Sequence, residues 1–105
     1  MLTLPIKKEW YHKICMYEKR EEYREIKPYW TKRFINAGLL FEDGTPTFRK
    51  TEILLRNGYG MYAPTIKVHV YLFISKKGCK EWGFPDDGKK YYVLKLIGKE
   101  IVHIS

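Results

Sequence analysis

Three charged residues, Lys19, Glu22 and Arg24, have the side-chain types and the spacing of a ligand-binding group. If residues 19–26 form a strand, Glu22 and Arg24 project from one face and Lys19 lies where the strand begins. A Glu and an Arg two residues apart can pair with each other or with a ligand. An unpaired buried charge costs several kcal/mol, so an inward-facing group would be a paired network or a binding site. The alternative is a solvent-facing strand edge whose charges prevent aggregation.

Cationic and aromatic residues are interleaved around these three. Between residues 7 and 33 the chain has nine Lys or Arg and five Glu, together with six Tyr or Trp. Single-stranded nucleic acid is typically held by cations along its backbone and by rings that stack on its bases. We expect Trp10 to be a core anchor of a helix, whereas Tyr29 and Trp30 are candidates for stacking. A turn at Asn57 to Gly60 adds an amide, the Tyr59 ring and glycines that permit close approach, although a turn without function fits it equally.

The elements that must position these residues are short. Helical spacing of apolar residues predicts a helix at 8–17, and a proline suited to a first helical turn predicts a second at 29–36. Alternating patterns predict strands, the last two joined as a hairpin at Gly98 and Lys99, with a loop at 76–87. Pro5 indicates either an edge position for the first strand or the end of that strand. The expected strands are 2–6, 19–26, 51–56, 66–74, 91–97 and 100–104.

Both helices precede most of the strands, so a doubly wound parallel sheet is not expected. The pattern favours an α+β, mainly β domain over residues 1–105, in which about six mostly antiparallel strands form a small barrel. Two short helices near the N-terminus would plug one end of it. No repeat or low-complexity linker divides the chain, and 105 residues are typical of one domain.

The formal net charge of +8 favours a polyanionic partner, most commonly nucleic acid, over a membrane surface. Cys15 and Cys79 form no Cys-x-x-Cys pair, and the three histidines are scattered, so neither a metal nor a cofactor is indicated. The chain begins without a signal-peptide pattern and has no apolar stretch of membrane-spanning length. We therefore expect a cytoplasmic protein with free thiols.

The sequence also resembles a known family. Lys19, Glu22 and Arg24 match the Gly-x-Lys-x-x-Glu-x-Arg pattern of ASCH domains, a branch of the PUA-like β-barrel superfamily, with Tyr17 at the glycine position. Further blocks look like a small single-domain subgroup of bacterial and phage genomes. They follow in the expected order over nearly the whole chain: 23–30, 56–60, 81–83 and 91–96.

The resemblance implies a cleft between the barrel and the early helices, with the charged trio at its floor, in which ASCH domains are suggested to bind RNA. Similar small enzymes remove the acetyl group from N4-acetylcytidine, using a Thr three residues after the Lys and a downstream Glu. Glu22 stands where that Thr would be. In a variant mechanism Lys19 could act as a base of lowered pKa, Glu22 or Glu81 could activate water, and Arg24 could steady an oxyanion.

Three functions therefore stand as hypotheses. The first is binding of RNA or a modified nucleoside, in which Glu22 accepts hydrogen bonds from a base edge. Lys19, Arg24 and Lys27 would contact phosphate or carbonyl oxygens. The rings of Tyr29, Trp30 and Tyr59 would stack on bases. Asn57 would complete the site. The second is a small amidohydrolase acting on an acylated nucleoside. The third is an interaction module whose basic face grips an acidic partner protein.

Overall fold

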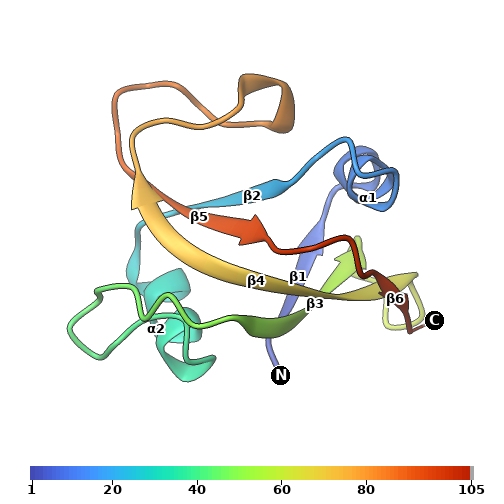
Figure 1. The fold of residues 1–105 in the computed structure, drawn as a ribbon, viewed down its shortest axis with the longest axis horizontal. Helices are drawn as coiled ribbons and strands as arrows, with labels where there is room; N and C mark the ends of the chain where they lie inside the picture. The colour runs from blue at the N-terminus through green and yellow to red at the C-terminus, as the bar shows by residue number, and fades with distance from the viewer. Residues whose placement is uncertain (105) are drawn as a thin grey trace.

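The computed structural model describes residues 1–104 and has the predicted architecture, a mainly β fold with two helices and six strands (Figure 1). The predicted α+β class and the number of strands are confirmed. In chain order the elements are β1 (Thr3–Ile6), α1 (Lys8–Cys15), β2 (Glu21–Glu25), α2 (Pro28–Asn36), β3 (Thr51–Asn57), β4 (Thr65–Ser75), the 3₁₀ turn η1 (Lys80–Trp82), β5 (Tyr91–Leu96) and β6 (Val102–His103).

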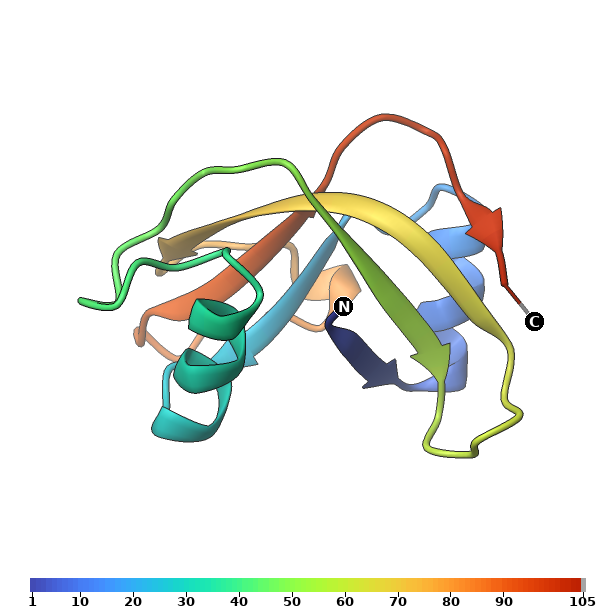
Figure 2. The ribbon, with the colours of Figure 1, turned by 90° about the horizontal axis from the view of Figure 1, so that it is seen from below.

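All six strands belong to one sheet, which curls into an open barrel (Figure 2). The strand order is β1-β3-β4-β5-β2, with β1 parallel to β3 and every other pairing antiparallel. The two edges are therefore β1 and β2, so the edge position predicted from Pro5 is confirmed. Proline has no N–H to offer another strand, which protects that edge from further pairing.

The core fills the concave side of the sheet beneath the two helices. Helix α1 contributes Tyr11 and Ile14, and α2 contributes Phe34. Alternate residues of the long strand β4 are buried between them, in the period of two that the sequence pattern predicts. The fully buried apolar side chains are Leu4, Ile14, Phe34, Leu39, Ile53, Leu55, Ile66, Val70, Leu72, Val93 and Leu94.

Helix α2 begins at Pro28, in the first-turn position that the sequence predicts. Helix α1 ends at Cys15, two residues earlier than predicted, because Tyr17 has a φ of 61° in the left-handed region. The exposed Tyr17 ring therefore leaves the helical stripe, and its hydroxyl donates to the carbonyl of Lys99 over 2.7 Å. This early end leaves residues 16–20 to turn the chain from α1 into β2.

The predicted hairpin between residues 91–97 and 100–104 is wrong, because β6 pairs with β4. Strand β5 ends at Leu96, opposite Val70 of β4, and β6 begins at Val102, opposite Lys67 of β4. Both strands therefore pair with the same side of β4, and residues 97–101 connect them. Because β5 already pairs with β4 on one side and β2 on the other, it has no free side for a hairpin partner, and Arg20 donates to the carbonyls of Leu96 and Gly98 where the chain leaves β5.

A second, smaller apolar cluster lies under the predicted loop between β4 and β5. Tyr23 of β2 packs edge-on against Phe84, and Tyr91 does the same from β5. A Cβ on Gly78 would stand 2.3 Å from the Phe84 ring, so glycine is required there for close packing. This cluster fixes the loop that carries η1 against the convex side of β2.

No helix within residues 1–104 has the length and apolar character needed to cross a membrane.

Candidate functional site

A cleft of about 720 Å³ opens between the two unpaired edges of the sheet, β1 and β2. Its remaining walls come from the start of α1, from α2, from the turn after β3 and from the end of η1. Most of the site residues predicted from the sequence lie in or beside it. The lining residues are Pro5, Ile6, Lys7, Lys8, Trp10, Glu22, Tyr23, Arg24, Glu25, Trp30, Asn57, Gly58, Tyr59, Trp82 and Gly83.

Lys19 lies at the base of this region, in the turn between α1 and β2, and is fully buried. Its ammonium donates to the carbonyl of Trp82 and lies 3.7 Å from Glu22 Oε2. It also faces two aromatic rings, Trp10 at 4.7 Å and Tyr23 at 5.2 Å from the ring centres. Burial lowers the pKa of Lys19 below its ordinary value, and the neighbouring Glu22 carboxylate partly restores it.

Glu22 is the buried acid of the cleft, with a side chain only 8% exposed. Its Oε1 accepts a hydrogen bond of 3.0 Å from Arg24 Nη1. Its Oε2 is buried and has no hydrogen-bond partner among the described residues, since Lys19 at 3.7 Å is too far to donate one. An ionised carboxylate only accepts hydrogen bonds, so this oxygen can take an N–H or O–H from a ligand.

Arg24 ties the two edges of the open barrel together. Its Nη1 also donates to the carbonyl of Tyr23 over 2.7 Å, and its Nη2 donates to the carbonyl of Pro5 on β1 over 3.1 Å. The guanidinium lies 5.1 Å from the ring centre of Trp30. The side chain thereby orients Glu22, bridges the mouth of the cleft and covers part of one aromatic wall.

The alternative of a solvent-facing strand edge is therefore wrong for these residues. Lys19 and Glu22 are buried and Arg24 is 14% exposed, so the inward face of β2 carries a paired network. A network of this kind costs desolvation, and the orphaned Glu22 oxygen adds to that cost.

All three tryptophans of the chain, Trp10, Trp30 and Trp82, line this cleft. The expectation that Trp10 is a core anchor is wrong: it is half-buried, lies outside the core cluster and packs over Lys19. Trp30 stacks on Phe34 of α2 with ring centres 6.0 Å apart. Trp82 was not identified from the sequence as a site residue, although η1 places it opposite α1.

Two predicted ligand residues, Lys27 and Tyr29, lie beside the cleft rather than in it. They line an adjoining hollow of about 320 Å³ that shares Pro5, Trp30 and Tyr59 with the cleft. Lys27 pairs with Glu25 at 3.4 Å. The Tyr29 ring is covered on one side by the Arg33 guanidinium at 3.6 Å. Trp30 also packs against the Tyr29 ring, edge to face, with ring centres 4.8 Å apart.

Asn57 and Tyr59 lie at the rim of the cleft, as a binding role for this turn would require. Tyr59 is 88% exposed, so its ring has almost no protein contact. Glu81 is exposed and does not line the cleft, since its carboxylate accepts a hydrogen bond from Cys79. The neighbouring Trp82 and Gly83 take that place.

Both cysteines are free thiols, as the sequence predicts. Within residues 1–104, no three His, Cys, Asp or Glu side chains lie together in a way that could hold a metal ion.

Comparison with known proteins returned no match to any protein-family model, curated protein or solved structure.

Proposed function

We propose that this cleft binds a nucleobase, presented by RNA or by a modified nucleoside. The observation that carries the proposal is Glu22 Oε2, which lies 3.7 Å from the Lys19 ammonium but accepts no hydrogen bond from the described residues, in a cleft that all three tryptophans line. A base offers flat faces that stack on indole rings and an edge that carries N–H donors. The cleft volume of about 720 Å³ is within the range of small-ligand sites.

The edge of a nucleobase and the Glu22 carboxylate are chemically complementary. A base N–H that reaches Glu22 Oε2 satisfies a buried acceptor, which removes a desolvation cost of about 1–3 kcal/mol from the folded protein. Arg24 keeps Glu22 in place through Oε1, so the carboxylate is oriented before the ligand arrives. Ligands without a donor on the corresponding edge would leave the acid unsatisfied and bind more weakly.

The resemblance to ASCH domains supports the same proposal. The three matched residues, Lys19, Glu22 and Arg24, contact one another, and the latter two line the cleft. Tyr17, which stands at the glycine of the ASCH pattern, has the left-handed φ of 61° that glycine adopts readily. The departure in residue type is therefore compatible with the backbone conformation that a glycine at this point would supply.

Tryptophan fluorescence tests the proposal directly, because every tryptophan of the chain is in the cleft. Titration with the four ribonucleosides and with N4-acetylcytidine should give a saturable change for at least one of them. Glu22→Gln should weaken that binding at least tenfold, since an amide presents a single acceptor oxygen and adds an N–H donor. The matched variant Glu52→Gln changes an acid outside the cleft and should bind as the wild type does.

RNA as the ligand would add sequence-independent contacts to this base contact. Lys27 at the adjoining hollow then meets phosphate, so Lys27→Ala should weaken binding to all RNA sequences alike. If the Lys27→Ala variant instead changed which bases are preferred, Lys27 would contact the base rather than the phosphate. A free nucleoside has no phosphate, so its affinity should be the same in this variant.

A second candidate function is hydrolysis of an N4-acylated cytidine. It is favoured by the lowered pKa of Lys19, which lies 3.7 Å from a Glu22 oxygen that accepts no hydrogen bond from the described residues. Because Glu81 lies outside the cleft, Glu22 would be the general base. It would accept a proton from the attacking water while the water oxygen bonds to the acyl carbon. Arg24 would stabilise the oxyanion, and the C–N bond would break as the leaving nitrogen takes up that proton, releasing cytidine and the acid.

Incubation with N4-acetylcytidine, followed by chromatography, distinguishes the two functions. Acetate and cytidine that form with the wild type, but not with Lys19→Ala or Glu22→Gln, would establish the enzyme. Saturable binding of the nucleoside without product would establish the binding site alone.

A further inference from the structure

Four lysines of this protein lie together at the neck of one loop. Strands β4 and β5 end their pairing at Ser75 and Tyr91, which are cross-strand partners. The next two residues on each side are all lysines, namely Lys76, Lys77, Lys89 and Lys90. They are four of the twenty Lys and Arg residues of the chain. Because paired residues of an antiparallel sheet lie about 5 Å apart at Cα, the two lysine pairs leave the sheet side by side.

All four lysines are exposed, and none forms an ion pair within residues 1–104. The acids of the same loop are already engaged. Asp86 pairs with Lys80 at 2.9 Å. Asp87 accepts hydrogen bonds from the backbone N–H of Lys89 and from the Tyr91 hydroxyl, one on each oxygen. Glu81 accepts from Cys79. Asp87 is the one acid of the loop that interacts electrostatically with a neck lysine, Lys89, so the four lysines outnumber the carboxylates that act on them within residues 1–104.

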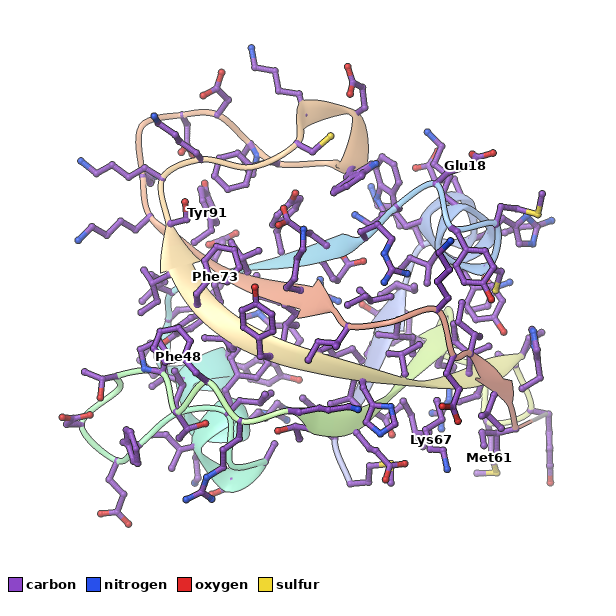
Figure 3. The ribbon with its side chains drawn as sticks, in the orientation of Figure 1. Glu18, Phe48, Met61, Lys67, Phe73 and Tyr91 are labelled. Carbon is purple, nitrogen blue, oxygen red and sulfur yellow. The ribbon has the colours of Figure 1, made fainter. Side chains whose placement is uncertain are left out.

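The backbone of the neck is held in place on both sides. The Ser75 hydroxyl accepts from the N–H of Lys77 and donates to its carbonyl, each over 2.9 Å. On the other side Asp87 holds the N–H of Lys89 over 3.0 Å. Side-chain turns of this kind fix the backbone locally. The lysines thus project from a positioned base, and nitrogen-tipped side chains extend outward from this part of the loop, near Tyr91 (Figure 3).

We infer that this lysine neck, residues 76, 77, 89 and 90, is a contact surface for the phosphate backbone of nucleic acid. Phosphates supply closely spaced negative charges that lysines meet as point charges, without sequence preference. A protein partner fits less well, since protein interfaces are built around apolar and aromatic anchors and are depleted in lysine. Between these lysines and the rest of the loop the neck has only Gly78 and Gly88.

The neck is separate from the cleft but belongs to the same loop. Trp82 and Gly83 of this loop line the cleft, whereas none of the four lysines does. A strand that inserts a base beside Trp82 would therefore have the loop alongside it. The inference does not require base binding in the cleft, because backbone contacts at the neck would hold nucleic acid on their own.

Salt dependence of binding tests the inference. The wild type and two quadruple variants are titrated with a fluorescein-labelled 12-nucleotide RNA of mixed sequence at several salt concentrations. In the neck variant Lys76, Lys77, Lys89 and Lys90 become Gln. In the control, Lys32, Arg49, Lys50 and Lys99 become Gln, which are also exposed and outside ion pairs within residues 1–104. Both variants lose the same total charge.

Each lysine that neutralises a phosphate contributes about 0.7 to the slope of log K against log salt on a single strand. The neck variant should therefore lose about 3 units of slope and bind at least tenfold more weakly at 100 mM salt. The control should lose less than 1 unit. Equal losses in the two variants would overturn the inference, because the effect would then be one of net charge alone.

Nucleoside binding, read by tryptophan fluorescence, separates this inference from the function of the cleft. Nucleosides have no phosphate, so the neck variant should bind them with wild-type affinity. RNA binding that depends on the neck without any nucleoside binding would leave the inference standing and remove the proposed cleft function. An acidic polypeptide such as polyglutamate, bound as tightly as RNA and with the same dependence on the neck, would overturn the assignment to nucleic acid.

Discussion

The cleft and the lysine neck hold positive charge in opposite ways. In the cleft Lys19 is buried and Arg24 nearly so, and each is paired with Glu22 or with backbone carbonyls. At the neck four lysines stand in solvent without an ion pair among residues 1–104. The same residue type therefore serves two physical purposes. In the cleft the positions of the charged groups are fixed by their partners. At the neck the lysines are close together, but no ion pair fixes the positions of their ammonium groups.

The difference teaches where selectivity can arise. A buried, oriented carboxylate discriminates between ligand edges, because an unsatisfied partner inside the protein is costly. Exposed lysines discriminate little, because water and salt replace their partners at small cost. The comparison therefore predicts that substitutions in the cleft change stability and selectivity, whereas substitutions at the neck change affinity and its dependence on salt.

The largest expected effect on stability comes from breaking the buried network. Lys19→Ala removes the cation beside Glu22 and the donor to the Trp82 carbonyl, so the free energy of unfolding should fall by about 3–5 kcal/mol. Lys67→Ala removes a half-exposed partner of Glu52 and should cost less than about 1 kcal/mol. Urea denaturation of both variants measures the difference. Equal losses would mean that the burial of Lys19 carries no special cost.

The pH dependence of stability sharpens the same point. The folded pKa of Lys19 lies below its ordinary value of 10.5, because burial disfavours the charged form. Between the two values the unfolded chain binds a proton that the folded protein does not, so raising the pH favours folding. Each unit of lowering corresponds to about 1.4 kcal/mol. Below the folded pKa both states are protonated, and the penalty is fully present.

Lys19→Met provides the reference for that measurement, since it removes the titration and keeps much of the side-chain volume. The difference in unfolding free energy between wild type and Lys19→Met should change in favour of the wild type from pH 8 toward pH 10.5. A difference that stays constant over this range would show that the pKa of Lys19 is the same in the folded and unfolded chains.

Alanine substitutions at two glycines of one loop allow the cleft and the neck to be compared, because Gly83 lines the cleft and Gly88 is next to the neck lysines. Gly83 and Gly88 have φ values of +95° and +81°, so alanine strains either position by about 1 kcal/mol. A Cβ on Gly83 would also stand 3.2 Å from the Trp10 ring, whereas a Cβ on Gly88 would have no atom within 4 Å. Both variants should lose similar stability, but only Gly83→Ala should shift the tryptophan emission and weaken ligand binding. A similar emission change in Gly88→Ala would contradict this separation.

Much of the fold could be predicted from the sequence because local patterns decide it. Alternation along β4, the proline at the start of α2 and Pro5 at an edge each act within a few residues. The hairpin prediction failed because both sides of β5 are already paired, with β4 and with β2, and Arg20 from a distant part of the chain donates to carbonyls at and after the end of β5. Distant hydrogen bonds of this kind leave no local pattern.

The same distinction applies to the cleft. The charged trio could be predicted because its members lie within six residues on one turn and strand. Trp82 could not, since only the packing of the loop on Tyr23 and Tyr91 brings it opposite α1. Trp10 was assigned to the core because helical spacing does not show that its ring lies over the Lys19 ammonium. Glu81 was expected in the site, and its two C-terminal neighbours line the cleft instead.

The smallest expected effect concerns the stability of the neck. Four lysines that leave the sheet side by side repel one another, since like charges on neighbouring strands are destabilising. Lys90→Gln should therefore leave the unfolding midpoint unchanged or raise it slightly, in contrast to the large loss expected for Lys19→Ala. Adding salt should stabilise the wild type more than the quadruple neck variant, because ions screen the repulsion. A clear loss of stability in Lys90→Gln would show that this lysine has a structural partner, and the neck would then resemble the cleft rather than contrast with it.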